Sequence, residues 1–179
     1  MKRWLPALLA AALCQAAPRA MAQDFCRQIK TIHAQGYRGF SQFRGAWLID
    51  TENYASLVVL SGASTCRITK WASRNDFSCT WDYEDRGDEA HVAAYQFAVG
   101  VRDCLAPQMG LPEFEDRPEQ LASRKDEILS HETIWKARIA PGQRRTTVDI
   151  SLDHTLARRS KSGRYYPDRY TIFMTMWYR

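Results

Sequence analysis

Apolar and polar side chains alternate in two neighbouring segments near the middle of the chain. Cys66, Ile68 and Lys70 point one way, whereas Thr65, Arg67, Thr69 and Trp71 point the other. Residues 77–82 alternate in the same manner. The polar run at 73–76, Ser-Arg-Asn-Asp, has the composition of a tight turn. The pattern therefore predicts a β-hairpin with Cys79 on its buried face.

The clearest helical pattern covers residues 85–105. Asp88 and Glu89 lie near its start, where acidic side chains interact favourably with the helix dipole. Apolar residues then recur at spacings of three and four and form a single stripe: Ala90, Ala94, Phe97, Val101 and Cys104. Such a helix is expected to pack against an apolar surface, most simply the face of a sheet.

Shorter patterns predict the remaining elements. A helix from Phe25 to Gln35 would be capped by Asp24 and end at Gly36. Further strands are expected at 47–50, 54–60, 133–140, 146–153 and 170–178, and the last of these is apolar on both faces, which favours a central position. We therefore predict a single α+β domain. Its antiparallel sheet packs against one long helix and a short N-terminal helix.

The first 22 residues have the pattern of a secretory signal peptide. Lys2 and Arg3 precede a short apolar stretch, and Ala20-Met21-Ala22 matches a small-x-small cleavage site that would leave Gln23 as the new N-terminus. The apolar stretch is too short for a membrane anchor, and no later run is long enough to span a bilayer. The sequence thus predicts a mature domain at 23–179 that is periplasmic or secreted.

Removal of this segment changes the charge of the protein. The whole chain has 25 basic and 20 acidic residues and a formal net charge of +5. Lys2, Arg3 and Arg19 belong to the signal peptide, so the mature part has 22 basic residues against the same 20 acidic ones. Nucleic-acid binders usually carry a strong basic excess. We therefore expect no nucleic-acid partner.

Four cysteines remain in the mature part, and an even number in an exported chain predicts two disulfides. Cys66 and Cys79 lie on neighbouring predicted strands, which favours their pairing among the three possible connectivities. Cys26 would then bond to Cys104 and tie the first helix to the second. The wide spacing of the cysteines does not resemble a zinc site, and we expect no metal and no cofactor.

The usual motifs of catalysis are missing from the sequence. Residues 88–91 spell Asp-Glu-Ala-His, as in a helicase box, but no phosphate-binding glycine loop accompanies them. Neither the His-Glu-x-x-His pattern of zinc peptidases nor the Gly-x-Ser-x-Gly of serine hydrolases is present. A carboxylate pair such as Glu89 with Asp149 could in principle serve a glycosidase.

Two segments combine arginine with aromatic residues, a composition that is enriched at protein interfaces. The first is a glycine-rich loop that contains Tyr37, Arg38, Phe40, Phe43 and Arg44. The second has five cations against one acid between residues 154 and 169. Its candidate binding residues are Arg158, Arg159, Lys161, Arg164, Tyr165, Tyr166 and Arg169. Either segment could bind a protein or an anionic component of the envelope.

The signal peptide, the disulfides and the size resemble those of small exported α+β proteins of Gram-negative bacteria as a class. The leading hypothesis is a non-catalytic binding protein, such as an inhibitor, an immunity-type protein or an envelope accessory factor. The alternative is a small periplasmic hydrolase with a histidine and carboxylate site. A structural module without specific binding is a third hypothesis. The oligomeric state cannot be predicted from the sequence.

Overall fold

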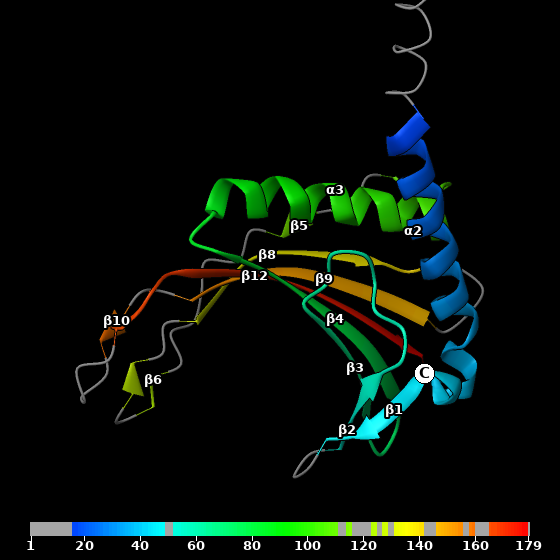
Figure 1. The fold of residues 1–179 in the computed structure, drawn as a ribbon, viewed down its shortest axis with the longest axis horizontal. Coiled ribbons are helices and arrows are strands. Elements are labelled where there is room, and N and C mark those ends of the chain that lie inside the picture. The colour runs from blue at the N-terminus through cyan, green and yellow to red at the C-terminus, as the bar shows by residue number, and fades with distance from the viewer. Residues whose placement is uncertain are drawn as a thin grey trace, which may run out of the picture.

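The computed structural model describes most of the chain from the first helix onward. The described residues are 16–48, 52–110, 114–115, 123–124, 127–128, 131–141, 146–155, 158–159 and 165–178. Figure 1 shows a twisted sheet with one helix lying along it and a second helix at one end. This arrangement confirms the predicted α+β fold with a sheet, a long helix and an N-terminal helix.

The main sheet is antiparallel and has eight strands in the order β1-β2-β3-β4-β12-β9-β8-β5. The strand that comes last in the chain, β12, therefore lies in the interior of the sheet between β4 and β9, as its apolar faces predicted. The strands are β1 (Arg44–Trp47), β2 (Asn53–Ser56), β3 (Thr65–Lys70), β4 (Asn75–Glu84), β5 (Phe114–Glu115), β8 (His131–Ile139), β9 (Thr146–Thr155) and β12 (Arg169–Tyr178).

Two longer helices and two short 3-10 turns complete the main body. The helix α3 (Gly87–Leu105) contacts β4, β8, β9 and β12 and covers one face of the sheet (Figure 1). The helix α2 (Ala16–Ala34) packs against α3 and is followed by η1 (Gly36–Arg38) and η2 (Ser41–Phe43). The alanines of α3 at 90, 94 and 98 are buried, so small side chains let the helix approach the sheet closely.

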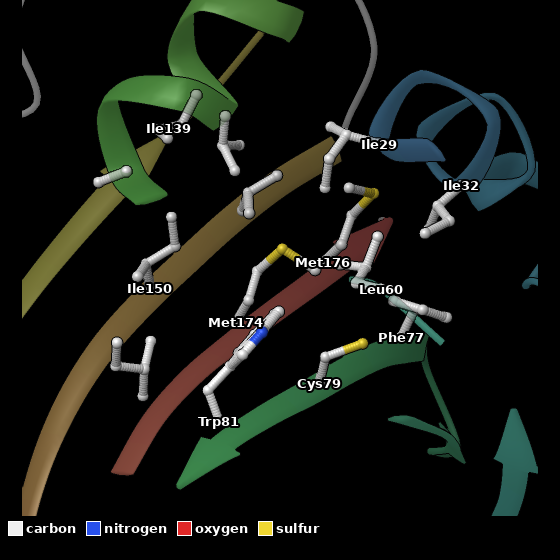
Figure 2. Close-up of a cluster of buried hydrophobic side chains, with 14 of the residues drawn as sticks. Ile29, Ile32, Leu60, Phe77, Cys79, Trp81, Ile139, Ile150, Met174 and Met176 are labelled. Atoms are coloured by element: carbon white, nitrogen blue, oxygen red, sulfur yellow. The ribbon is translucent and has the colours of Figure 1, made fainter. Parts of the chain in front are cut away.

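The core lies between the sheet and the two helices, as Figure 2 shows. Met174 and Met176 of β12 stand at its centre and are fully buried. Ile150 and Ile139 extend the core through β9 and β8, and Phe77, Cys79 and Trp81 extend it through β4. Ile29 and Ile32 of α2 close the end nearest the C-terminus of β12.

Both predicted disulfides are formed. Cys26 of α2 is bonded to Cys104 at the end of α3, and Cys66 is bonded to Cys79, its direct partner in the pairing of β3 with β4. The first bridge joins the two helices and the second crosses the hairpin. Such bonds are typical of proteins that fold in an oxidising, extracytoplasmic environment.

Two small hairpins stand outside the main sheet. One pairs β6 (Ser123–Arg124) with β7 (Glu127–Ile128), and the other pairs β10 (Arg158–Arg159) with β11 (Tyr165–Tyr166). In Figure 1 both hairpins lie at the end of the sheet away from α2. Two-stranded hairpins contribute little stability by themselves, so neither is required to build the core.

The first strands differ from the sequence-based expectation. The strand expected at 54–60 ends at Ser56, whose hydroxyl accepts a hydrogen bond from the Val58 amide at 3.1 Å and donates one to the Val58 carbonyl at 2.7 Å. This local bonding competes with the sheet ladder and ends the strand. The apolar segment after Ser56 still contributes to the core, because Leu60 is buried there although it lies in a loop.

The predicted signal peptide lies largely outside the described residues. The helix α2 begins at Ala16 and continues through the predicted cleavage position after Ala22. Its processing therefore stays a prediction. Within the part that is described, no helix has both the length and the apolar character that crossing a bilayer requires.

Candidate functional site

The glycine-rich loop between α2 and β1 is folded into two successive 3-10 turns. Gly39 and Phe40 join them, both in the left-handed region, with φ values of 61° and 56°. At Gly39 a β-carbon would lie 2.6 Å from the side-chain amide nitrogen of Asn75, so a larger residue would displace that side chain in addition to the strain of the positive φ. Phe40 tolerates its unusual backbone because its ring is fully buried and lies 5.9 Å from that of Phe77.

The burial of Phe40 corrects one expectation from the sequence. Phe40 was expected on a binding surface, but it belongs to the core and cannot contact a partner in this structure. Phe43 is buried as well. Both rings point inward at this left-handed turn. The loop sequence has no regular alternation of apolar and polar residues, so their burial could not be predicted from it.

Arg44 connects the loop to the sheet. Its Nη2 donates hydrogen bonds to the Gly39 carbonyl and to Oδ1 of Asn75, both at 3.1 Å. Its guanidinium also lies 5.2 Å from the centre of the Tyr54 ring. The side chain is only partly exposed, so its clearest task is to hold the loop against the first residue of β4.

Among the candidate binding residues of the loop, Tyr37 and Arg38 are the two that are exposed. The Tyr37 side chain is 55% exposed, and the Arg38 guanidinium lies 5.1 Å from the centre of its ring. An arginine held against an exposed tyrosine is already partly ordered before it meets a partner. These two residues keep the position on the surface that the sequence predicted for them.

The structure adds aromatic residues that the sequence analysis missed. Trp47 at the end of β1 is 64% exposed and Trp71 in the turn before β4 is 52% exposed. Leu48 follows Trp47 and is also exposed. The alternation at 65–71 places Trp71 on the side opposite Cys66 and Ile68, but neither tryptophan was included among the candidate binding residues.

Arg74 and Asp76 fix the orientation of this region. Trp71 donates its indole Nε1–H to Oδ2 of Asp76 at 2.8 Å, and Arg74 Nε lies 3.1 Å from Oδ1 of the same carboxylate. Arg74 also lies 5.2 Å from the centre of the Trp177 ring. We use the name β1 corner for six residues of the loop, β1 and the turn between β3 and β4: Tyr37, Arg38, Trp47, Leu48, Trp71 and Arg74.

Two carboxylates lie on the face of the sheet that α3 leaves open, and their pKa values are shifted in opposite directions. Burial raises the pKa of Asp76 above its ordinary value, although Arg74 and Trp71 act against this. Burial works in the same direction on Asp149, but hydrogen bonds from Arg138 and the charge of Lys136 outweigh it and lower the pKa of Asp149. Asp149 is therefore held as a charged, structurally paired group.

The second predicted surface lies on the hairpin of β10 and β11. The pairing places Arg158 opposite Tyr166 and Arg159 opposite Tyr165, and Tyr165 is 61% exposed. Arg169 follows at the start of β12, where its Nε lies 3.4 Å from Oδ1 of Asp82. Two further residues predicted for this surface, Lys161 and Arg164, lie outside the described residues.

The two predicted surfaces are at opposite ends of β12. Arg169 begins the strand beside the hairpin, whereas Tyr178 ends it next to Gly36, at the start of the loop that bears Tyr37 (Figure 1). A strand of ten residues spans about 30 Å. The fold therefore does not bring the two sets of candidate residues together into one binding surface.

A histidine and a carboxylate do meet at the start of β12. His154 is largely buried, its ring stacks on Tyr170 with centroids 4.2 Å apart, and its Nε2 lies 3.4 Å from Oδ1 of Asp168. His91 approaches Tyr170 from α3 with a centroid distance of 6.5 Å. Among the described residues, this cluster best resembles the pairing of a histidine with a carboxylate that the hydrolase hypothesis requires.

The carboxylate pair considered for a glycosidase is not assembled. Asp149 lies between Val148 and Ile150, whose side chains point into the core beneath α3, so its own side chain is on the opposite face of the sheet. Glu89 is exposed in the first turn of α3, on the helix side. The sheet thus separates these two groups.

No cluster of metal ligands is evident among the described residues. No three of their histidine, cysteine, aspartate and glutamate side chains are grouped as metal ligands would be. A shallow open depression runs along α2, lined by Cys26, Arg27, Lys30, Thr31 and Ala34. Because a single helix supplies these residues, groups from different elements do not converge there as they do in most ligand sites.

The chain was also compared with known proteins. No protein-family model matches it, and the searches of curated proteins and of solved structures found no match either.

Proposed function

We propose that the protein is a non-catalytic binding protein of the periplasm or the extracellular space, and that it binds a protein of the cell envelope through the β1 corner. The observation that carries this proposal is the exposure of three aromatic side chains, Tyr37 on the loop, Trp47 on β1 and Trp71 in the turn between β3 and β4. Exposed aromatic residues beside arginine are the composition of interface hot spots.

The preorganisation of the β1 corner supports the same function. Arg44 anchors the loop to Asn75, Arg38 rests on Tyr37, and Trp71 is held by Asp76. Side chains that are already ordered lose less conformational entropy when they bind a partner. The two disulfides join the helices to each other and cross the β3–β4 hairpin, which suits a protein that works outside the cytoplasm.

Chemical crosslinking in the cell envelope tests this proposal with a matched pair of variants. The oxidised protein would be crosslinked in intact envelopes, and its adducts identified by mass. Tyr37→Ala/Arg38→Ala removes one tyrosine and one arginine from the β1 corner. Arg164→Ala/Tyr165→Ala removes the same two residue types near the β10–β11 hairpin, so the two variants have equal charge.

We expect one stoichiometric adduct that is lost in Tyr37→Ala/Arg38→Ala and retained in Arg164→Ala/Tyr165→Ala. The reverse result would move the binding surface to the hairpin and overturn the assignment to the β1 corner. The same adduct in both variants would also overturn it. The absence of any adduct with the unmodified protein would contradict a binding function.

The hydrolase is a second candidate because His154 and Asp168 lie 3.4 Å apart. A carboxylate that orients a histidine is the usual partner of a general base. Replacement of His154 by glutamine separates the two functions. Turnover of an envelope substrate that is lost in His154→Gln would support the enzyme, whereas an unchanged crosslinked adduct in this variant supports binding.

A further inference from the structure

The carboxylate of Asp76 holds two members of the β1 corner at once. Its Oδ2 accepts the hydrogen bond from the Trp71 indole at 2.8 Å, and its Oδ1 lies 3.1 Å from Nε of Arg74. Asp76 is only 5% exposed, whereas Trp71 is exposed and Arg74 is partly exposed. A buried acidic group therefore fixes two side chains that a partner could contact.

Both contacts depend on the negative charge of Asp76. A hydrogen bond to a charged acceptor is stronger than one to a neutral acceptor, so a proton on the carboxyl group would weaken the bond from Trp71. The same proton would remove the ion pair with Arg74. The guanidinium of Arg74 would then keep only its contact with the Trp177 ring, whose centre lies 5.2 Å away.

The surroundings of Asp76 favour uptake of this proton. Its direct partners on β3 and β12 are Thr69 and Trp177, which are uncharged, and α3 lies on the other face of the sheet. Burial raises the pKa of Asp76, the charge of Asp149 on β9 adds to this, and Arg74 and Trp71 oppose it. The folded protein therefore binds this proton more readily than the unfolded chain does, so neutralising Asp76 does not by itself oppose folding.

The loop beside this turn is held by groups that do not titrate in mild acid. Asn75, between Arg74 and Asp76 in the chain, accepts a hydrogen bond from Arg44 at 3.1 Å, and Arg44 anchors the loop that bears Tyr37. An amide has no charge to lose, and a guanidinium keeps its charge. Acid would therefore act on the turn between β3 and β4 and leave the anchor of the loop in place.

We propose that Asp76 is an acid-sensitive clamp on the turn between β3 and β4, which holds Trp71 and Arg74 for a partner when it is charged and releases them when it takes up a proton. This inference rests on the binding function proposed above and gives its regulation. Because side chains that are already ordered lose less entropy on binding, the charged form should bind the partner more tightly than the protonated form.

The indole Nε1–H resonance of Trp71 in the NMR spectrum reports the clamp directly. We expect it to shift with pH in one step, with a midpoint above 3.8, while the protein stays folded. Trp177 provides an internal comparison, because its indole donates to Asp149, whose pKa is lowered, and its step should lie below 3.8. A Trp71 resonance without a step, or with a midpoint below 3.8, would overturn the proposal.

Two matched substitutions on the same face of the sheet identify the titrating group. Asp76→Asn should remove the step of the Trp71 resonance. Asp149→Asn should retain it, at a slightly lower pH because the charge of Asp149 raises the pKa of Asp76. A step that survives Asp76→Asn would contradict the clamp.

A third variant keeps the test decisive if Asp76→Asn does not fold. The charge of Arg74 lowers the pKa of Asp76, so Arg74→Gln should move the midpoint of the Trp71 step to higher pH. An unmoved midpoint would mean that Arg74 and Asp76 are not coupled, and the clamp would be wrong.

Retention of the partner tests the consequence for binding. The partner identified by crosslinking would be captured on the immobilised protein and washed in neutral or mildly acid buffer. We expect acid to lower the retained amount about fivefold for the unmodified protein and for Asp149→Asn, as loss of one ion pair or hydrogen bond would. Asp76→Asn should bind as weakly in neutral buffer as the unmodified protein does in acid.

The outcomes separate the clamp from the binding function. Equal retention in neutral and acid buffer would overturn the clamp and leave the binding function standing. Release by acid to the same extent in Asp76→Asn and Asp149→Asn would assign the effect to another group and would also overturn the clamp. Failure to capture any partner at neutral pH, with a Trp71 resonance that still titrates, would instead overturn the binding function.

Discussion

Arg138 on β8 holds both carboxylate oxygens of Asp149, its direct partner on β9. The distances are 2.7 Å from Nε to Oδ1 and 3.2 Å from Nη2 to Oδ2, and the Trp177 indole adds a longer hydrogen bond of 3.4 Å to Oδ2. One carboxylate thereby connects the last three long strands on the face away from α3. A bidentate pair of this kind is stronger than an ordinary surface ion pair.

Replacement of Asp149 by asparagine should lower the free energy of unfolding at neutral pH by about 1 kcal/mol. The pKa of Asp149 is lowered in the folded protein, so its stabilising effect is present above the ordinary value of 3.8 and is lost as the pH falls through the lowered pKa. Urea unfolding at a series of pH values measures this. If the Asp149→Asn variant is still less stable than the unmodified protein in strong acid, the charge of Asp149 is not the source of the stabilisation.

Asp76 should show the opposite dependence on pH. Burial raises its pKa in the folded protein, so its contribution to stability is largest below 3.8 and declines as the pH rises through the raised pKa. The Asp76→Asn variant should therefore lose less stability at neutral pH than Asp149→Asn does. Urea unfolding at the same series of pH values compares the two variants. If the loss of stability depends on pH in the same direction for Asp76→Asn and Asp149→Asn, the opposite pKa shifts are disproved.

The two disulfides should differ in what they contribute to stability. Cys26–Cys104 closes a loop with a sequence separation of 78 residues, whereas Cys66–Cys79 closes one of 13. Because a longer loop loses more entropy on closure, paired replacement by alanine should cost about 4 kcal/mol for the first bridge and about 3 kcal/mol for the second. Denaturant unfolding of the two double variants gives the order, and a reversed order would contradict the loop argument.

Gly87 should not tolerate a side chain, because Tyr170 occupies the space beside it. A β-carbon there would lie 2.8 Å from Cζ of the Tyr170 ring, which itself stacks on His154. We expect Gly87→Ala to reduce the free energy of unfolding by about 1–3 kcal/mol, as overpacking does elsewhere. Gly110→Ala is the control, since its β-carbon would meet no atom within 4 Å, and similar losses in both variants would refute the steric explanation.

Export should remove the first 22 residues. Mass spectrometry of the exported protein is expected to give a chain that starts at Gln23 and retains both disulfides. Asp24, which pairs with Arg27 at 2.7 Å, would then lie in the first turn of the shortened α2. An exported chain that still contains residues 1–22 would contradict the signal-peptide prediction.

Regular periodicity made the sheet, the long helix and the disulfide pairing predictable. Cys66 and Cys79 could be paired because alternation placed both on the inward face of one hairpin, and the stripe on α3 located Cys104. The structure of residues 57–60 could not be predicted, because the strand ends at a hydrogen bond of the Ser56 hydroxyl. Leu60 therefore packs into the core from a loop and not from a strand.

The candidate site was less accessible from the sequence. Composition indicated the loop with Tyr37 and Arg38 but could not tell that the left-handed turn buries Phe40. Trp47 and Trp71 were missed because exposure depends on which strand lies at the edge, and strand order depends on long-range pairing. For the same reason the sequence could not show that the loop and the β10–β11 hairpin lie at opposite ends of the sheet.

The interior position of β12 constrains the route by which the protein folds. β4 and β9 pair with this strand and not with each other, although both precede it in the chain. The two halves of the sheet therefore cannot join until β12 is available. Such long-range pairing slows folding and keeps incomplete chains open. A chain in this state is suited to crossing a membrane as an extended polymer and acquiring its fold on the far side.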